Sequence, residues 1–167
     1  IGLTDDTSEF SVSAVSDADG SANSVSESAA DGAVVGITAF ASDADSTDSV
    51  SYSLTDDAGG RFAIDPTTGQ FTVADASLLD YETATSHTIT VQAESSDGST
   101  QTQSFTIGLS DDTSEFSVTA VSDTDGGANT VSESAADGAV VGITSFASDV
   151  DSTDTVSYSL TDDAGGR

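Results

Sequence analysis

Short runs in which apolar and polar residues alternate recur along the chain at intervals of roughly ten residues, a pattern typical of an all-β sandwich. The segment Asp65-Pro66-Thr67-Thr68-Gly69 lies between two of these runs and predicts a hairpin turn. Only residues 74–79 leave room for a short helical turn. We expect about seven strands per module, at residues 10–14, 33–41, 50–54, 62–64, 70–73, 87–93 and 103–109.

The chain also repeats itself at an offset of 106 residues, because residues 1–61 and 107–167 differ at only eight positions. Every acidic residue of the first copy recurs in the second, and a period of this length corresponds to one whole domain. Near-identical neighbours favour a role that depends on repetition, such as length or avidity. The differing pairs are Thr4/Ser110, Ser13/Thr119, Ala18/Thr124, Ser21/Gly127, Ser24/Thr130, Ala39/Ser145, Ala44/Val150 and Ser49/Thr155.

The repeat predicts a complete module at residues 7–112 and the first part of a second at 113–167, with residues 1–6 ending a preceding link. Counterparts of residues 62–109 are absent from the second copy, so we expect a longer polypeptide to supply them. The apolar face of the second copy should then be more exposed than that of the first. The side chains expected to be more exposed are Val140, Ile143, Phe146, Val156, Tyr158 and Leu160, and their first-copy counterparts are Val34, Ile37, Phe40, Val50, Tyr52 and Leu54.

Charge adds a constraint to this architecture. The chain has 30 acidic and 2 basic residues and a formal net charge of -28, which excludes nucleic acid and anionic membrane surfaces as partners. Two carboxylates about 5 Å apart repel by about 3 kcal/mol at an effective dielectric constant of 20. Because the acids occur in short clusters between apolar runs, cations between them would relieve this repulsion. Ca²⁺, which prefers many oxygen ligands, is the expected ion.

Other classes of function lack their usual residues. There is no cysteine, so a metal is expected to replace the disulfides common in small extracellular domains. No apolar run has the length needed to insert into a membrane. His87 lies on an expected strand with no serine or acidic partner, and the sequence has neither GxSxG nor a glycine-rich phosphate loop. We therefore predict no catalytic residue and no enzymatic activity, and a structural role for His87.

The acidic motifs follow one another in the order of a cadherin repeat: Glu27 in VSES, Asp43 and Asp45 in ASDADS, Asp80 and Glu82 in LLDYE, and Asp97 in AESSDGS. Residues 52–73 (YSLTDDAGGRFAIDPTTGQFTV) also resemble that family. The resemblance covers the whole period and implies a Greek-key sandwich that binds calcium at module junctions. The sequence is most similar to the cadherin-like extender modules of giant bacterial adhesins, many of which have RTX export signals. Those modules are also acidic and cysteine-free, and within one adhesin they repeat with nearly identical sequence.

Two further segments carry candidate ligands. Residues 111–115 (DDTSE) stand where animal cadherins have DxNDN, so acidic side chains would replace the amide ligands. Residues 17–23 (DADGSAN) have the spacing of the start of a calcium loop, but not the remaining ligands of an EF-hand. With their second-copy counterparts, the candidate ligands are Asp17, Asp19, Asn23, Glu27, Asp43, Asp45, Asp80, Glu82, Asp97, Asp111, Asp112, Glu115, Asp123, Asp125, Asn129, Glu133, Asp149 and Asp151.

These observations predict a calcium-rigidified spacer module in the stalk of a very large adhesin on the bacterial cell surface. Its partners would be neighbouring repeats of the same chain, joined through calcium. The alternative is a homophilic or ligand-binding adhesion module. An apolar patch on one sandwich face would favour this alternative, whereas polar outer faces rich in serine and threonine would favour the spacer.

Overall fold

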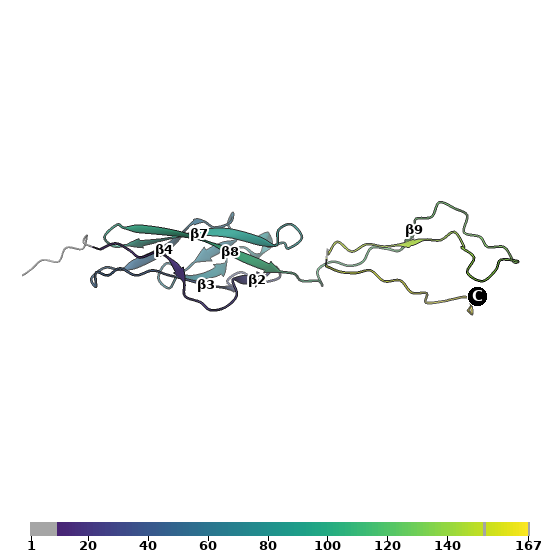
Figure 1. Ribbon diagram of the computed structural model, residues 1–167, viewed down its shortest axis with the longest axis horizontal. Helices are drawn as coiled ribbons and strands as arrows, with labels where there is room; N and C mark the ends of the chain where they lie inside the picture. Colours follow the sequence, from purple (N-terminus) through teal and green to yellow (C-terminus); the bar gives the residue numbers. More distant parts are fainter. Residues whose placement is uncertain (1–9, 152, 167) are drawn as a thin grey trace, which may run out of the picture. The chain divides into compact units, whose positions relative to one another are not determined.

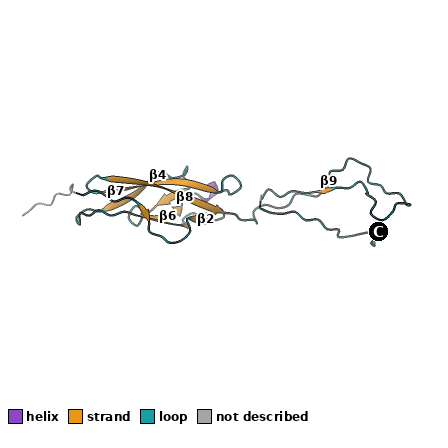
Figure 2. Cartoon of the chain, viewed as in Figure 1, coloured by secondary structure: helices purple, strands orange, loops and turns teal. Residues whose placement is uncertain are grey.

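The computed structural model describes residues 10–151 and 153–166 of the chain (Figure 1). These residues divide into two compact units, the first ending at Asp112 and the second beginning at Thr113. Residues 1–6, the expected end of a preceding link, lie outside the described residues. Regular strands are concentrated in the first unit, whereas loops make up most of residues 113–166 (Figure 2).

The first unit is a sandwich of two four-stranded sheets, which confirms the predicted all-β class. One sheet has the order β1-β3-β6-β5, with strands at Ser16–Asp17, Val34–Phe40, Gln70–Val73 and Phe62–Ile64. The other has the order β2-β8-β7-β4, with strands at Ser24–Ser26, Thr100–Ser110, Ser86–Ser95 and Val50–Asp56. The long antiparallel pair β7 and β8 runs through the first unit and defines its axis (Figure 1).

Alternation along the strands builds the core between the two sheets. On β7, Ile89, Val91 and Ala93 are fully buried, whereas the residues between them face outward. Phe71 on β6 and Ile107 on β8 belong to the same buried cluster. The outward positions of β4, β7 and β8 are polar: Ser51, Ser53, Thr88, Thr90, Gln92, Thr102, Ser104 and Thr106. This sheet therefore has one apolar and one hydroxyl-rich face.

The predicted hairpin and helical turn are both confirmed. Strands β5 and β6 are joined by a turn in which Asp65 accepts hydrogen bonds from the backbone N–H groups of Thr67 and Thr68. These bonds, chiefly that from Thr68, hold the pKa of the Asp65 carboxyl below its ordinary value. A single 3₁₀ turn, η1, covers Ala76–Leu78. Among the described residues, no helix has the length and hydrophobicity needed to cross a membrane.

The predicted strand at residues 10–14 is wrong. Val12 and Val15 are the buried side chains of this segment, a spacing of three that does not fit the period of two of a regular strand. Instead β1 pairs with β3 in one sheet, and β2 pairs in parallel with β8 in the other. Residues 18–23 connect β1 to β2, so this loop carries the chain from one sheet to the other.

The comparison of apolar faces is correct for four pairs and wrong for two. Exposure is higher in the second copy for the pairs Val34/Val140, Ile37/Ile143, Tyr52/Tyr158 and Leu54/Leu160. Phe40 and Phe146 are equally exposed, and Val50 and Val156 are both half-buried. Phe40 is exposed even in the first copy because the register of β3 turns Val35, Ile37 and Ala39 inward and leaves Val34 and Phe40 outward.

The second unit keeps part of the local arrangement of the first. Strand β9 (Ser122–Asp123) pairs with β10 (Ser145–Phe146) in the register of β1 with β3, shifted by the repeat offset. The Tyr158 hydroxyl binds the backbone of Ala147, as the Tyr52 hydroxyl binds that of Ala41. The described part of residues 113–166 thus repeats these local features of the half-module at residues 10–60, whereas its counterparts of β2 and β4 are not strands.

Gly69 provides a test of the turn geometry. Its φ of +72° is unfavourable for other residues, and a Cβ there would lie 2.2 Å from the carbonyl oxygen of Ala39. We expect Gly69→Ala to destabilise the first unit by at least about 2 kcal/mol, which corresponds to a Tm lower by about 10 °C. Gly20→Ala is the control, because a Cβ there meets no atom within 4 Å. Equal melting of the two variants would contradict the hairpin geometry.

Candidate metal centres

The first candidate centre, the hairpin cluster, consists of Asp43, Asp48 and Asp97. Asp43 and Asp48 lie in the segment between β3 and β4, and Asp97 lies in the turn between β7 and β8. Each offers a carboxylate oxygen, and the three oxygens lie within 4.8 Å of one another. Three carboxylates from two distant segments therefore converge on one point at the turn end of the β7–β8 pair.

Local hydrogen bonds hold this cluster in shape. Asp43 accepts the N–H of Asp45 at 3.0 Å, and Asp48 accepts the Ser96 hydroxyl at 2.7 Å. Asp97 accepts the N–H of Ser99 at 2.7 Å, and this bond is the main reason why the pKa of the Asp97 carboxyl is below its ordinary value. Asp43 and Asp97 are thus each held by a neighbour two residues further along the chain, whereas the bond from Ser96 to Asp48 ties the segment before β4 to the turn between β7 and β8.

The second candidate centre, the exit cluster, consists of Glu27, Glu82 and Asp111. Glu27 directly follows β2, Glu82 lies between η1 and β7, and Asp111 directly follows β8, where the chain leaves the first unit. A carboxylate oxygen of Glu82 lies within 4.8 Å of one from Glu27, and likewise within 4.8 Å of one from Asp111. Glu82 is therefore the central member of the cluster.

Glu27 also fixes the backbone around the exit cluster. Its side chain is only 5% exposed, and its two carboxylate oxygens accept the N–H groups of Tyr81 and Asp112. Its own N–H donates to the carbonyl of Ser110. One buried carboxylate thus ties together the end of β2, the segment after η1 and the chain exit, and charge-assisted bonds of this kind are strong.

The two clusters lie at opposite ends of one sandwich. Asp97 precedes β8 and Asp111 follows it. Eleven residues of strand at about 3.4 Å each separate them by about 30 Å or more. The acidic residues that the sequence orders along one module therefore gather in two clusters, one at each end, rather than in one group.

Both clusters offer oxygen donors of the kind that Ca²⁺ prefers. Within the described residues, Oδ2 of Asp43, Asp45 and Asp48 and both carboxylate oxygens of Glu82 are buried and accept no hydrogen bond. Buried, unpartnered carboxylate oxygens are costly unless a cation compensates them. Arg61 does not do so here, because it donates to the backbone carbonyls of Ala58 and Leu78. An oxygen-rich anionic donor set of this kind suits Ca²⁺.

Several predicted ligands of the first unit lie outside these clusters. Asp45 is buried beside the hairpin cluster and accepts the N–H and hydroxyl of Thr47. Both oxygens of Asp80 accept bonds from Thr83. Asp112 contributes its N–H to Glu27. Their roles as metal ligands remain predictions.

The loop at residues 17–23 has a clear structural role. Asp17 accepts the N–H groups of Asp19 and Thr38, and Asp19 accepts the N–H of Ser21. The bonds from Ser21 lower the pKa of Asp19. The carbonyl of Asn23 accepts the N–H of Gly108 on β8. These bonds turn the chain between the two sheets, while calcium binding by this loop remains a prediction.

The second-copy candidates are mostly exposed. Asp123 accepts the N–H groups of Thr144 and Asp125, which lower its pKa, with Thr144 contributing most. Asp151 is buried and accepts the N–H and hydroxyl of Thr153, and Asp149 is half-buried. Glu115, Asp125, Asn129 and Glu133 are exposed. Metal ligation by all of these residues also remains a prediction.

Asp48 is the residue that sequence reasoning missed. The sequence DADSTD places a third acid three residues after Asp45, and the same acid recurs as Asp154 in the second copy. The available signal was its place in the same acidic segment as Asp43 and Asp45. His87, by contrast, packs its ring against Phe62, with centroids 6.3 Å apart. Its burial, with a smaller contribution from the charge of Arg61, lowers its pKa.

Residues 21–110 match the model of the cadherin domain family. A crystal structure of mouse cadherin-23 EC22-24 is similar with a TM-score of 0.53 and 26% identity, over 66% of this chain and 35% of that one. A crystal structure of human protocadherin-24 EC1-2 has a TM-score of 0.45 and 26% identity, over 53% of this chain and 40% of that one. The chain thus spans well under two thirds of either solved chain. No curated protein sequence matches it.

Glu27 and Glu133 form a matched pair for mutation. In chelator, we expect Glu27→Ala to lower the stability of the first unit by about 2–4 kcal/mol, because two backbone N–H groups lose a buried charged acceptor. The corresponding fall in Tm is about 10 °C or more. Glu133→Ala makes the same change at an exposed position one repeat later and should leave this transition unchanged. Equal shifts in differential scanning calorimetry would show that Glu27 does not fix the exit.

Proposed function

The chain belongs to the cadherin domain family, whose members are extracellular adhesion modules, and on this basis we propose that it is a calcium-rigidified spacer. In this proposal the modules follow one another in the stalk of a large, repetitive adhesin on the bacterial cell surface. The observation that carries the proposal is the presence of one carboxylate cluster at each end of a single sandwich.

Each end would supply half of a junction. The exit cluster of one module (Glu27, Glu82 and Asp111) would bind Ca²⁺ together with the counterpart of the hairpin cluster in the next module. The bound ions would neutralise carboxylates that otherwise repel one another and would remove the freedom of a short polar link. Repetition of this junction would convert a flexible string of domains into an extended rod.

The outer faces support a spacer more than a homophilic adhesion module. One outer face is rich in serine, threonine and glutamine. The other carries Val34 and Phe40, both about half exposed, at opposite ends of the same strand. Six residues of strand separate these two side chains by about 20 Å, so they do not form one continuous patch.

A homophilic module is the second candidate, because Phe40 is exposed and its counterpart Phe146 is equally exposed. Sedimentation velocity distinguishes the two functions. Calcium-dependent dimers at micromolar concentration that disappear in Phe40→Ser would favour homophilic adhesion. A monomer under the same conditions favours the spacer, consistent with the net charge of -28.

Calcium should raise the melting temperature of an intact repeat. At a free concentration a thousandfold above Kd, one ion that binds only the folded state stabilises it by about 4 kcal/mol, or about 15–30 °C in a domain of this size. Glu82→Gln should reduce the shift, whereas Glu94→Gln makes the same charge change at an exposed position outside both clusters. An identical melting curve in calcium and in chelator would refute the metal-binding proposal.

Calcium should also lengthen a protein of two complete repeats. Small-angle X-ray scattering should give a larger maximum dimension and a narrower distribution of shapes with calcium than with chelator, because bound ions fix the junction. Asp48→Asn and Glu82→Gln in both repeats should make the two profiles alike. If the unmodified protein has the same maximum dimension in both buffers, the ions bind without rigidifying the junction.

A further inference from the structure

The loop that joins β6 to β7 carries Glu82, the central member of the exit cluster, and side chains from other segments hold this loop in place. Asp31 accepts the N–H of Ala76, the first residue of η1, at 2.7 Å. Glu27 accepts the N–H of Tyr81, the residue directly before Glu82. Neither bond requires a bound ion, so the loop has a defined position before calcium binds.

Arg61 holds the part of the loop that lies between these two points. Its Nε donates to the carbonyl of Leu78 at 2.9 Å, and its Nη1 donates to the carbonyl of Ala58 at 2.7 Å. The backbone carbonyl of Arg61 also accepts the N–H of Ala74, at the start of the loop, at 2.8 Å. We propose, on the basis of the calcium binding proposed above, that Arg61 is a positioning residue of the exit cluster. It fixes the backbone that carries Glu82 and thereby raises the affinity of the cluster for Ca²⁺.

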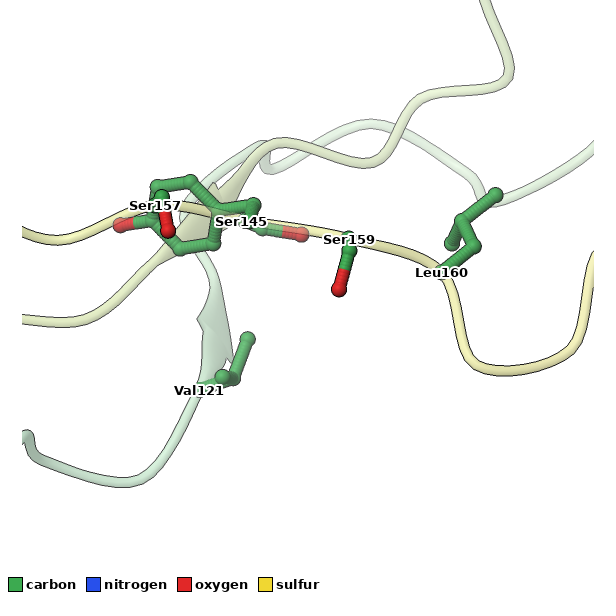
Figure 3. A pocket seen from close by; sticks show the side chains of 6 residues that line it. Val121, Ser145, Ser157, Ser159 and Leu160 are labelled. Carbon is green, nitrogen blue, oxygen red and sulfur yellow. The ribbon is translucent and has the colours of Figure 1, made fainter.

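The turn before Arg61 takes its shape from its own sequence. Ala58 has a φ of +58°, a left-handed conformation that is unfavourable for a residue with a Cβ. Its counterpart Ala164 has a φ of +51°, although the segment from Ser157 to Leu160 before it is not a strand (Figure 3). In both copies, an aspartate two residues earlier accepts the N–H of this alanine. The turn is therefore a locally formed support from which Arg61 reaches the loop.

Arginine suits this task because its planar guanidinium holds several N–H donors in a fixed fork, which here reaches carbonyls of two different segments. Lysine has the same charge but a single nitrogen on a flexible stem, so it would not reproduce both bonds in one fixed geometry. An anchored loop loses less conformational entropy when its carboxylate binds an ion. Arg61→Lys should therefore weaken calcium binding without a change in net charge.

The test compares Arg61→Lys with the unmodified 167-residue chain. A calcium titration followed by NMR of the backbone amides reads the exit cluster at the N–H of Tyr81 and the hairpin cluster at the N–H of Ser99. We expect the Kd read at Tyr81 to rise about threefold to tenfold in the variant, whereas the Kd read at Ser99 stays the same. An unchanged Kd at Tyr81, or an equal rise at both positions, would overturn the inference.

Amide hydrogen exchange in chelator tests the same role without calcium. The N–H groups of Leu79, Tyr81 and Ala84, which are hydrogen-bonded in the loop, should exchange at least about tenfold faster in Arg61→Lys because local opening becomes easier. The N–H of Val91 in β7 is the control and should exchange at the same rate in both proteins. Unchanged exchange in the loop would overturn the inference. If the unmodified chain shows no calcium-dependent change at either cluster, the proposed function fails, and the exchange rates still decide whether Arg61 positions the loop.

Discussion

Electrostatic repulsion between carboxylates at the two ends of the sandwich is the constraint on which the rest of the structure depends. A backbone in which β7 and β8 run the length of the unit brings acids from distant segments together at each end. Glu82 and Asp48 then keep buried oxygens that accept no hydrogen bond within the described part of the chain. Buried carboxylate oxygens of this kind are costly unless a cation compensates them.

The sequence predicted the class of fold and most strands because period-two alternation in segments such as residues 87–93 directly reflects burial. It could not predict that the first edge segment divides between two sheets, since pairing of β2 with β8 is a long-range contact without a local signal. It likewise placed Val34 and Phe40 on the wrong face, because several apolar residues in succession hide the register.

The sequence predicted which acidic residues are candidate ligands better than it predicted which of them lie together in the fold. Glu27, Asp43, Glu82 and Asp97 were identified from their order, but order along a chain does not reveal which strand ends lie together. The separation into two clusters follows from the length of β8, and the place of Asp48 follows from the loop that precedes β4. The bonds that Glu27 makes to two backbone N–H groups were likewise invisible, because they require the folded positions of Tyr81 and Asp112.

The hydrogen bond from the Val12 N–H to the Ser99 hydroxyl has a consequence for how a chain of near-identical repeats avoids misfolding. It anchors the start of a half-module at the turn end of β8, whereas the link to the next repeat leaves from the opposite end. Suppose that residues 62–110 packed with the downstream half-module instead. Val118, the counterpart of Val12, would then have to reach Ser99. The eight residues from Ser110 to Val118 can extend at most about 29 Å, whereas Ser99 lies about 37 Å from Ser110 along β8. Connectivity alone therefore directs each set of strands to the upstream half-module, although the two candidates are almost the same sequence.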